Sequence, residues 1–338
     1  IENNASVVFN QSSNGTYAGV MSGTGGLTKS GAGNLTLTGA NIYSGGTTVS
    51  GGTLTGTTTS LQGNIVNNAA VFFTGGGTYA GNMTGTGSLN VSATGLLILS
   101  GTNAYAGGTT INSGTLQGNA SSLQGNILNN AAVVFDQSTT GTYAGAITGT
   151  GSLTKTGAGL LSLTGNSVVG GGTTVSGGVL VVNGSLTSNV TVTNGGALGG
   201  SGALIGALAV NGGTVAPGNS IGTMTVTGNF SQTGGVYQVE VNSAGQNDKI
   251  VATGTATING GTVQVLATSG SYQRNTTYTI VTATGGLTGT YGGVSSNLAF
   301  LTPSLSYDAN NVYLLLEQAA SAFASGAQTS NQRAVGNA

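Results

Sequence analysis

The sequence predicts an all-β fold, a parallel β-helix whose short strands stack in successive coils. Three observations support this prediction. A block at residues 15–54 returns at 77–116 and again at 141–180, and a self-similar period of this size is typical of stacked solenoid units. The composition, with 65 Gly and 3% charged residues, is far from that of an ordinary globular chain. Apolar residues recur at strand-like spacing between Gly and Asn corners.

The three blocks keep one register. They are offset by 62 residues (77 − 15) and 64 residues (141 − 77), and a length of this size predicts three coils of about 21 residues per unit. We expect the recurring apolar side chains to point inward as ladders, while Thr and Ser face outward on the pleated surface. The recurring apolar positions are Leu27, Leu35, Leu37, Val49 and Leu54; Leu89, Leu97, Leu99, Ile111 and Leu116; and Leu153, Leu161, Leu163, Val175 and Leu180.

A second motif recurs between these blocks. It reads NNASVVF at residues 3–9, NNAAVFF at 67–73 and NNAAVVF at 129–135. Glycine interrupts every window of this region, and each glycine inside a helix costs about 1 kcal/mol, so a helix does not compete. Short strands separated by corners stack at about 4.8 Å, with backbone hydrogen bonds along the solenoid axis.

Charge and residue types exclude several classes of site. The net charge is −1, and five basic residues are scattered along the chain, which is no footprint for nucleic acid or anionic lipid. Cysteine and histidine are both absent, which excludes disulfides, His/Cys metal sites and the usual acyl-transfer triads. No apolar run approaches the roughly 18 residues of a membrane-spanning helix. We therefore expect no catalytic residue, no cofactor and no metal.

The pattern changes after Leu180. Shorter coils are expected over residues 181–239, with a turn at residues 216–222 that is rich in Gly, Pro and Asn. Residues 300–316, which read FLTPSLSYDANNVYLLL, predict an antiparallel hairpin. A distinct terminal unit fits a solenoid, because its last coil would otherwise expose an unpaired edge. Residues 319–327 fit a short helix.

Several of these segments resemble the C-terminal passenger region of bacterial autotransporters, the pertactin-like proteins of type Va secretion. The resemblance begins at residues 247–256, NDKIVATGTA, and continues through 278–283 and 287–291 to the hairpin. The turn APGNSIG at 216–222 is similar to one found just upstream in that family, and the three blocks are similar to its passenger-associated transport repeat. Residues 331–335 resemble the start of the linker into the translocator barrel.

The resemblance implies a right-handed parallel β-helix with a C-terminal β-hairpin cap. It also implies a translocator β-barrel in cis as partner, and a place at the bacterial cell surface, on the extracellular side of the outer membrane, or release from it. The C-terminal part would fold first as an autochaperone. Its implied core residues are Asp248, Ile250, Tyr278, Ile280, Tyr291, Phe300, Tyr307 and Tyr313.

Four parts are therefore expected. A repeat stalk of three units spans residues 1–180, shorter coils span 181–239, an autochaperone-like cap spans 240–317, and a linker towards the translocator spans 318–338. Two repeats depart from the family pattern. Val91 stands where the other units have Lys29 and Lys155, and the third unit has Ser167 and Val169 in place of Asn and Tyr. Neither change breaks the apolar register.

The residues with chemical potential are better explained by structure. Asp308 is interpreted as a turn former, Glu240 as an exposed edge or corner residue, and Asp248 with Lys249 as a solvated pair at a strand start. The recurrent Tyr17, Tyr79 and Tyr143 suggest a sugar-stacking stripe, but a buried or half-buried ladder is favoured. The Asn pairs at 3–4, 67–68 and 129–130 are interpreted as internal corner ladders, and the GxGxxG-like runs lead into no helix.

We expect a non-enzymatic surface passenger, a β-helical stalk with a folding nucleus. Its expected role is adhesion, autoaggregation or biofilm formation, through self-association or a host-surface or matrix ligand. The alternative is a scaffold that displays an upstream functional domain. A β-helical polysaccharide-active enzyme is disfavoured because clustered Asp, Lys or Arg residues are missing. An ice- or crystal-binding solenoid is suggested by the Thr pairs at 47–48, 109–110 and 173–174, but one pair per three coils is sparse.

Overall fold

The computed structural model describes residues 1–273, 275–299 and 301–318. Its regular elements in these ranges are β-strands, most of them paired in parallel, which confirms the predicted β-helix. None of the described segments forms a helix long and apolar enough to cross a membrane. Phe300, the helix expected at 319–327 and the linker expected at 318–338 lie outside the described residues, except for residue 318. The chain divides into two compact units, the first of them Ile1–Thr174 with Leu186–Ser188.

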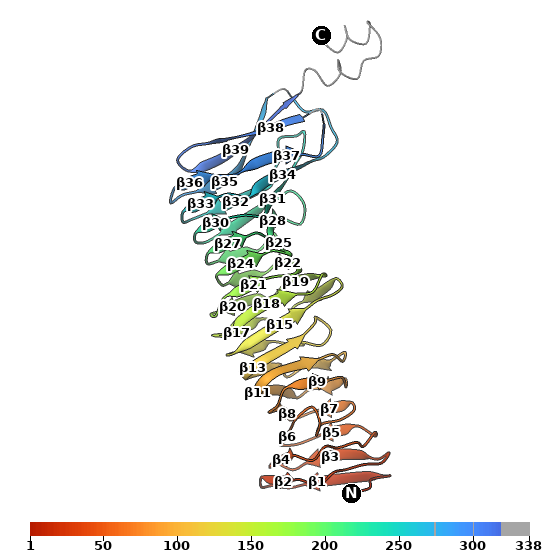
Figure 1. Cartoon of the computed structure of the whole chain (residues 1–338). Coiled ribbons are helices and arrows are strands. Elements are labelled where there is room, and N and C mark those ends of the chain that lie inside the picture. The colour runs from red at the N-terminus through yellow and green to blue at the C-terminus, as the bar shows by residue number, and fades with distance from the viewer. Residues whose placement is uncertain (274, 300, 319–338) are drawn as a thin grey trace, which may run out of the picture. The chain divides into compact units, whose positions relative to one another are not determined.

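The coils of the first unit have three faces, which we call A, B and C, and Figure 1 shows their strands stacked from β1 towards β20. Face A consists of β1 (Ser6–Asn10), β3 (Gly26–Ser30), β5 (Thr47–Val49), β7 (Ile65–Asn67), β10 (Met83–Gly85) and β12 (Ala104–Tyr105). Face B consists of β2 (Gly15–Tyr17), β4 (Asn34–Leu37), β6 (Thr53–Gly56), β8 (Ala70–Phe73), β11 (Ser88–Leu99), β13 (Thr109–Gly118), β14 (Ile127–Asn129), β17 (Ile147–Gly149), β20 (Asn166–Val169) and β23 (Ser185–Thr187). Face C consists of β9 (Gly77–Tyr79), the second halves of β11 and β13, β15 (Ala132–Asp136), β18 (Ser152–Thr156) and β21 (Thr173–Val175). A further parallel pair joins β16 (Gly141–Tyr143) to β19 (Leu160–Leu163).

The repeat does not return to the same face, contrary to the expected three coils per unit. From Leu27 on face A, parallel pairing leads through Thr47 and Ile65 to Met83, three coils and 56 residues (83 − 27) later. Leu89, the repeat equivalent of Leu27, lies 6 residues further (89 − 83), on face B. The coils are shorter than 21 residues, so a unit of 62 residues makes three coils and moves on by one face.

The same shift occurs in the next repeat. From Leu89, pairing leads through Thr109 and Ile127 to Ile147, 58 residues (147 − 89) later. Leu153, again 6 residues further (153 − 147), pairs with Val133 on face C. Equivalent residues of successive repeats therefore point to successive faces.

Buried lysines shape two of the corners between faces. Lys29 is fully buried, and its Nζ donates hydrogen bonds to the carbonyl oxygens of Ser30 at 2.7 Å, Gly31 at 2.9 Å and Gly51 at 3.0 Å. These acceptors satisfy all three ammonium hydrogens, which a buried charge requires. Gly31 turns the chain at a φ of 73°, a conformation that glycine adopts without strain.

The second repeat makes the same corner without a lysine. At the third-repeat corner, Lys155 is buried and donates to the carbonyls of Thr156 at 2.6 Å and Gly157 at 2.9 Å. Val91 cannot donate, and there β11 continues as one 12-residue strand with a register shift against β13. The lysine therefore accompanies a tight turn, and the valine accompanies a bulged strand.

The second unit comprises Val175–Ser185 and the residues from Asn189 onward, and it also has three rows of parallel strands. One row contains β22 (Gly178–Val182), β25 (Gly196–Gly200), β28 (Thr214–Pro217), β31 (Val236–Val241), β34 (Thr262–Ala267) and β37 (Gly293–Ser296). Another contains β24 (Val190–Thr193), β27 (Leu208–Asn211), β30 (Phe230–Gln232), β33 (Ala256–Asn259) and β36 (Leu287–Thr290). The third contains β26 (Ala203–Ile205), β29 (Thr223–Val226), β32 (Lys249–Ala252) and β35 (Thr276–Ala283), followed by the hairpin strands β39 (Asn311–Gln318) and β38 (Leu301–Tyr307).

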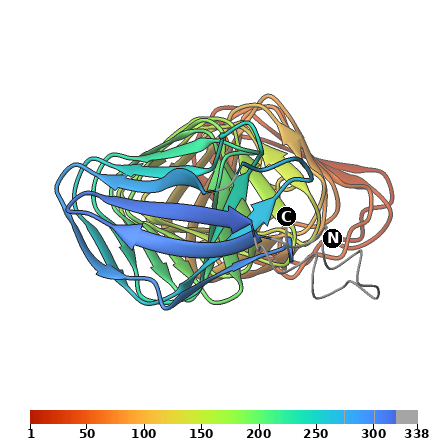
Figure 2. The same cartoon turned by 90° about the horizontal axis from the view of Figure 1, so that it is seen from above.

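The predicted C-terminal hairpin is confirmed. The strands β38 and β39 are antiparallel, with Tyr307 opposite Val312, and Figure 2 shows them side by side. β39 also pairs antiparallel with β35, with Thr276 opposite Leu316, so the hairpin covers an edge that a further parallel strand would otherwise occupy. Val312, Leu314 and Leu316 are buried beneath it.

Candidate functional site

Two outward rows of side chains form the most regular exposed surface of the first unit. We call them ladder A and ladder B, after their faces. Each row follows the parallel register from strand to strand, and none of its members is ionisable. Ladder A contains Val8, Thr28, Thr48, Val66, Thr84 and Ala104. Ladder B contains Phe72, Asn90, Thr110, Leu128, Thr148 and Val168.

The two ladders are repeat equivalents of one another, because every member of ladder B lies 62 or 64 residues after its counterpart in ladder A. Their apolar members are exposed to a similar degree: Val66 is 43% exposed in ladder A, and Leu128 is 44% exposed in ladder B. Each of these aliphatic side chains stands between two threonines of the adjoining coils. The shift by one face therefore gives two adjacent faces the same surface chemistry.

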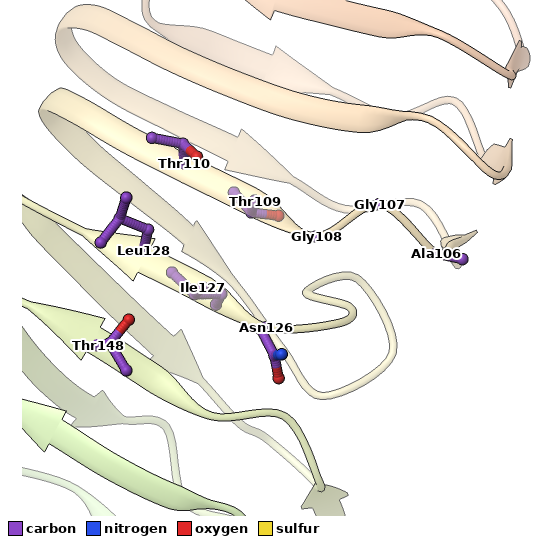
Figure 3. A pocket seen from close by; sticks show the side chains of 9 residues that line it. All are labelled: Ala106, Gly107, Gly108, Thr109, Thr110, Asn126, Ile127, Leu128 and Thr148. Carbon is purple, nitrogen blue, oxygen red and sulfur yellow. The ribbon is translucent and has the colours of Figure 1, made fainter.

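Ladder B borders a shallow hollow of about 270 Å³. Figure 3 shows the side chains of Thr110, Leu128 and Thr148 on three neighbouring strands, with Asn126 at the end of the middle strand. The hollow is lined by neutral groups alone: hydroxyls, one amide, aliphatic carbons and the backbone of Gly107 and Gly108. This arrangement suits contact with a neutral surface and offers no group for acid–base chemistry.

The recurrent tyrosines do not form a stripe. Tyr17 pairs with Leu37 on face B, Tyr79 lies on face C, and Tyr143 lies in the β16–β19 pair, so the three rings are on different sheets. Tyr79 and Tyr143 are buried, and their hydroxyls donate to the carbonyls of Gly63 at 2.6 Å and Gly125 at 2.5 Å. The favoured reading as buried or half-buried rings holds for each residue, but the ladder does not exist.

Each of these tyrosines packs against the phenylalanine of the neighbouring NNA motif. The ring centroids are 5.5 Å apart for Phe9 and Tyr17, 5.3 Å for Phe73 and Tyr79, and 4.9 Å for Phe135 and Tyr143. Contacts of this kind add about 0.5–1.5 kcal/mol to the free energy gained from burial. The aromatic positions of the repeat therefore hold the coils together.

The asparagines of the NNA motif bind within their own corners. Asn3, Asn67 and Asn129 are buried, and their amide groups donate to the carbonyls of Gly26, Ser88 and Ser152 at 2.8–2.9 Å. They are inward corner residues, as expected. Because the repeat moves on by one face, Asn67 ends a strand of face A and Asn129 ends one of face B, so they do not stack on each other.

The Thr pairs do not form a flat array either. Thr47 and Thr109 are buried, and each bonds at 2.7 Å to a tyrosine hydroxyl, from Tyr43 and Tyr105 respectively. Only the second threonine of these two pairs faces outward, on face A in one repeat and on face B in the next. An array of the kind needed to match ice or a crystal surface is thus absent from these faces.

Asp248 is the most unusual ionisable group of the second unit, and its interpretation as a solvated residue is wrong. It is 1% exposed. Its Oδ1 accepts a hydrogen bond from the backbone N–H of Gly222 at 2.8 Å, and its Oδ2 accepts one from the N–H of Glu240 at 2.8 Å. One carboxylate thus joins the end of the APGNSIG turn, strand β31 and the start of β32.

Burial raises the pKa of Asp248 to about 7, because desolvation disfavours the charged form. The two N–H donors oppose this shift, and the nearby Glu240 carboxylate adds to it. The predicted closeness of Glu240 and Asp248 is therefore real, but both contacts go through the backbone of Glu240. The carboxyl group fastens three segments of the chain to one another.

Tyrosine hydroxyls make further long-range connections in the same unit. Tyr237 is fully buried and donates to the carbonyl of Ile280 at 2.7 Å, 43 residues away. Tyr278 donates to the carbonyl of Asn242 at 2.8 Å, and burial raises the pKa of Tyr278 to about 12. Ile250 and Ile280 are buried in the core. Tyr237 was not among the predicted residues, although its place in an alternating strand was the signal for it.

The remaining predicted residues lie near the hairpin. Tyr291 is buried beside Tyr237, with ring centroids 6.2 Å apart, and its backbone N–H donates to the Tyr307 hydroxyl at 3.1 Å. Tyr313 donates to Asp308 Oδ2 at 2.8 Å at the hairpin turn. Asp308 also accepts bonds from the N–H groups of residues 310 and 311, which lower its pKa to about 2 and agree with its expected role as a turn former.

Comparison with known proteins agrees with this architecture. The passenger-associated-transport-repeat family matches residues 27–59, 94–117 and 153–182. The second match begins after Val91, the position that lacks the lysine and forms the bulged corner. The chain is similar to the adhesin BmaC autotransporter of Brucella suis biovar 1 (strain 1330), with 34% identity over 166 residues, which are 40% of this chain and 5% of that protein.

The chain is also similar to an extracellular serine protease of Serratia marcescens. The identity is 38% over 114 residues, which are 31% of this chain and 11% of that protein. The chain is an autotransporter passenger segment. It spans only a small part of the length of both relatives. As a passenger segment, it belongs at the bacterial cell surface or is released from it.

Proposed function

We propose that this passenger segment is non-enzymatic and serves adhesion through association between copies on neighbouring cells. The observation that supports this most directly is the neutral, regular surface of ladders A and B. An exposed row of threonine and aliphatic side chains suits a broad, weak contact that is repeated many times. Similarity to an adhesin from Brucella suis supports the same class of function.

The placement of the ionisable side chains supports a non-enzymatic role. Lys29 and Lys155 are buried in corners, Asp248 is buried in a backbone junction, and Asp308 closes a turn. The chain has no histidine, so its own residues cannot build the usual Ser-His-Asp triad of a serine protease. The protease relative aligns with the present chain over only 11% of its own length.

We propose in addition that residues 240–317 act as the folding nucleus during secretion, with a translocator domain as partner. The hydrogen bonds of Asp248, Tyr237 and Tyr278 support this role, because they connect segments 26 to 43 residues apart and are independent of the repeats. The covered edge at β35 supports it as well.

Cell display tests the adhesion proposal. The segment is displayed on cells that do not clump by themselves, and settling is followed in still suspension. We expect settling when the segment is present and none when it is absent. A suspension that stays dispersed at every expression level contradicts self-association, and a displayed upstream domain would then carry the function. Glycan turnover by the purified segment would contradict the non-enzymatic part.

A further inference from the structure

We propose that ladders A and B are two separate docking surfaces for further copies of this chain, so that one copy binds two neighbours in different directions. This inference rests on the proposed self-association and adds its location and geometry. The repeat advances by one face every 62 to 64 residues, and ladder B is therefore the chemical copy of ladder A on the next face. A repeat that returned to its own face would present a single such surface.

The spacing of the ladders selects a second copy as the partner. Each rung is a strand paired in parallel with the next, so successive side chains stand about 4.8 Å apart along the axis. Another stack of parallel strands has the same rung spacing and stays in register over the whole row. Once one rung has docked, each further contact is intramolecular, so weak rungs combine into a stable association.

The charges of the first unit permit like surfaces to meet. In residues 1–174 the charged side chains are Glu2, Lys29, Asp136 and Lys155. Both lysines are fully buried, and Asp136 lies on face C, opposite Lys155 and Thr156 in the parallel register of β18. Neither ladder contains an ionisable member, so two copies do not repel each other there.

The pattern within each ladder is self-complementary. Val66 and Leu128 project between threonines, at 43% and 44% exposure. When two ladders meet with a shift of one rung, each aliphatic side chain packs against a threonine methyl group or another aliphatic side chain, and the hydroxyls keep contact with water or with each other. The hollow beside Leu128, lined by Gly107 and Gly108, leaves room for a side chain of the partner.

Charged substitutions test the two ladders separately. Val66→Lys blocks ladder A and Leu128→Lys blocks ladder B. Ile42→Lys is the matched control, since Ile42 is 71% exposed and belongs to neither ladder. The purified 338-residue chain and each variant are compared by sedimentation velocity over a concentration series, with circular dichroism to confirm the fold.

We expect the unchanged chain and Ile42→Lys to grow beyond dimers, each single ladder variant to stop at the dimer or below, and the double variant to remain monomeric. Mixing the double Lys variant with the double Glu variant at the same positions should restore association through opposite charges. That rescue also excludes misfolding as the cause of the loss.

The outcomes separate this inference from the proposal on which it rests. If the unchanged chain remains monomeric at all concentrations, self-association itself is wrong. If it assembles, but the Val66 and Leu128 variants assemble equally well, self-association stands and the ladders are not its site. If Ile42→Lys disrupts assembly as strongly as the ladder variants, the effect of charge is general and the ladders have no special role.

Discussion

Replacing Asp248 by Asn tests how far one buried carboxylate holds the C-terminal coils together. The substitution keeps the size of the side chain and removes its charge. An amide has one oxygen, so it can accept a hydrogen bond from Gly222 or from Glu240 but not from both. The NH2 group then faces a backbone N–H, where two donors meet without an acceptor.

The structure sets the size of the effect. Both hydrogen bonds to Asp248 are 2.8 Å long, and the carboxyl group is 1% exposed. A buried donor without a partner costs about 1–3 kcal/mol. We therefore expect the variant to lose about 1–3 kcal/mol of unfolding free energy in the second unit at pH 5.

The loss should depend on pH in a defined direction. The pKa of Asp248 is raised from 3.8 to about 7 in the folded chain, so between these values the folded state binds more protons than the unfolded state. Stability then falls as pH rises from about 4 to about 7, by at most about 1.4 kcal/mol per pH unit, and is constant above that. The Asn variant lacks this titration, so its deficit relative to the unchanged chain should shrink between pH 5 and pH 8.

Hydrogen exchange measured by mass spectrometry reads the effect locally, which matters because a solenoid need not unfold in one step. Peptides covering residues 222–252 are followed at pH 5 and pH 8, after correction for the intrinsic exchange rate. Asp308→Asn is the matched control: the pKa of Asp308 is lowered to about 2, and the stability it provides is lost only as pH falls below about 4. If the deficit of Asp248→Asn is the same at both pH values, this account of the carboxyl group is wrong.

Three further predictions concern the corners and the cap. Lys155→Met should cost about 2–4 kcal/mol, because buried carbonyls lose their donor, whereas Val91→Met should cost less than about 1.5 kcal/mol; urea unfolding followed by circular dichroism compares them. Tyr237→Phe should lower stability by about 1–3 kcal/mol, since the Ile280 carbonyl loses its 2.7 Å bond, and an unchanged melting temperature would contradict this. Deleting residues 300–316 should open the edge of β35 to proteases and lower the refolding yield, and equal resistance to limited proteolysis would refute the role of the hairpin.

The repeats and the strand-forming segments were predictable from the sequence. Alternating side chains, glycine corners and the offsets of 62 and 64 residues are local properties, and they suffice to predict strands and stacking. The hairpin at Asp308 was predictable for the same reason, because two alternating strands flank a short turn. The inward position of residues such as Leu27 and Leu89 followed from the apolar register.

The strand neighbours in the second unit were harder to predict. Spacing suggested a row through Val190, Leu208 and Met224, but Leu208 pairs with Phe230, and Met224 pairs with Ile250 in another row. The turn at 216–222 adds residues to one corner, and a register inferred from spacing alone cannot tell a longer corner from a longer strand. The environment of Asp248 was hidden for a related reason, since its partner Gly222 lies 26 residues away.

The sequence by itself determined that this chain is a repetitive, nearly uncharged β-helix, because composition and periodicity are written in neighbouring residues. Only the tertiary structure decided which repeats face the same way. That outcome depends on the number of residues in each coil, which the corners set: a lysine-capped turn after Lys29 and a bulged strand after Val91 use the chain differently. A difference of 6 residues between three coils and one repeat moves Leu89 to the next face, and with it every outward residue of its unit.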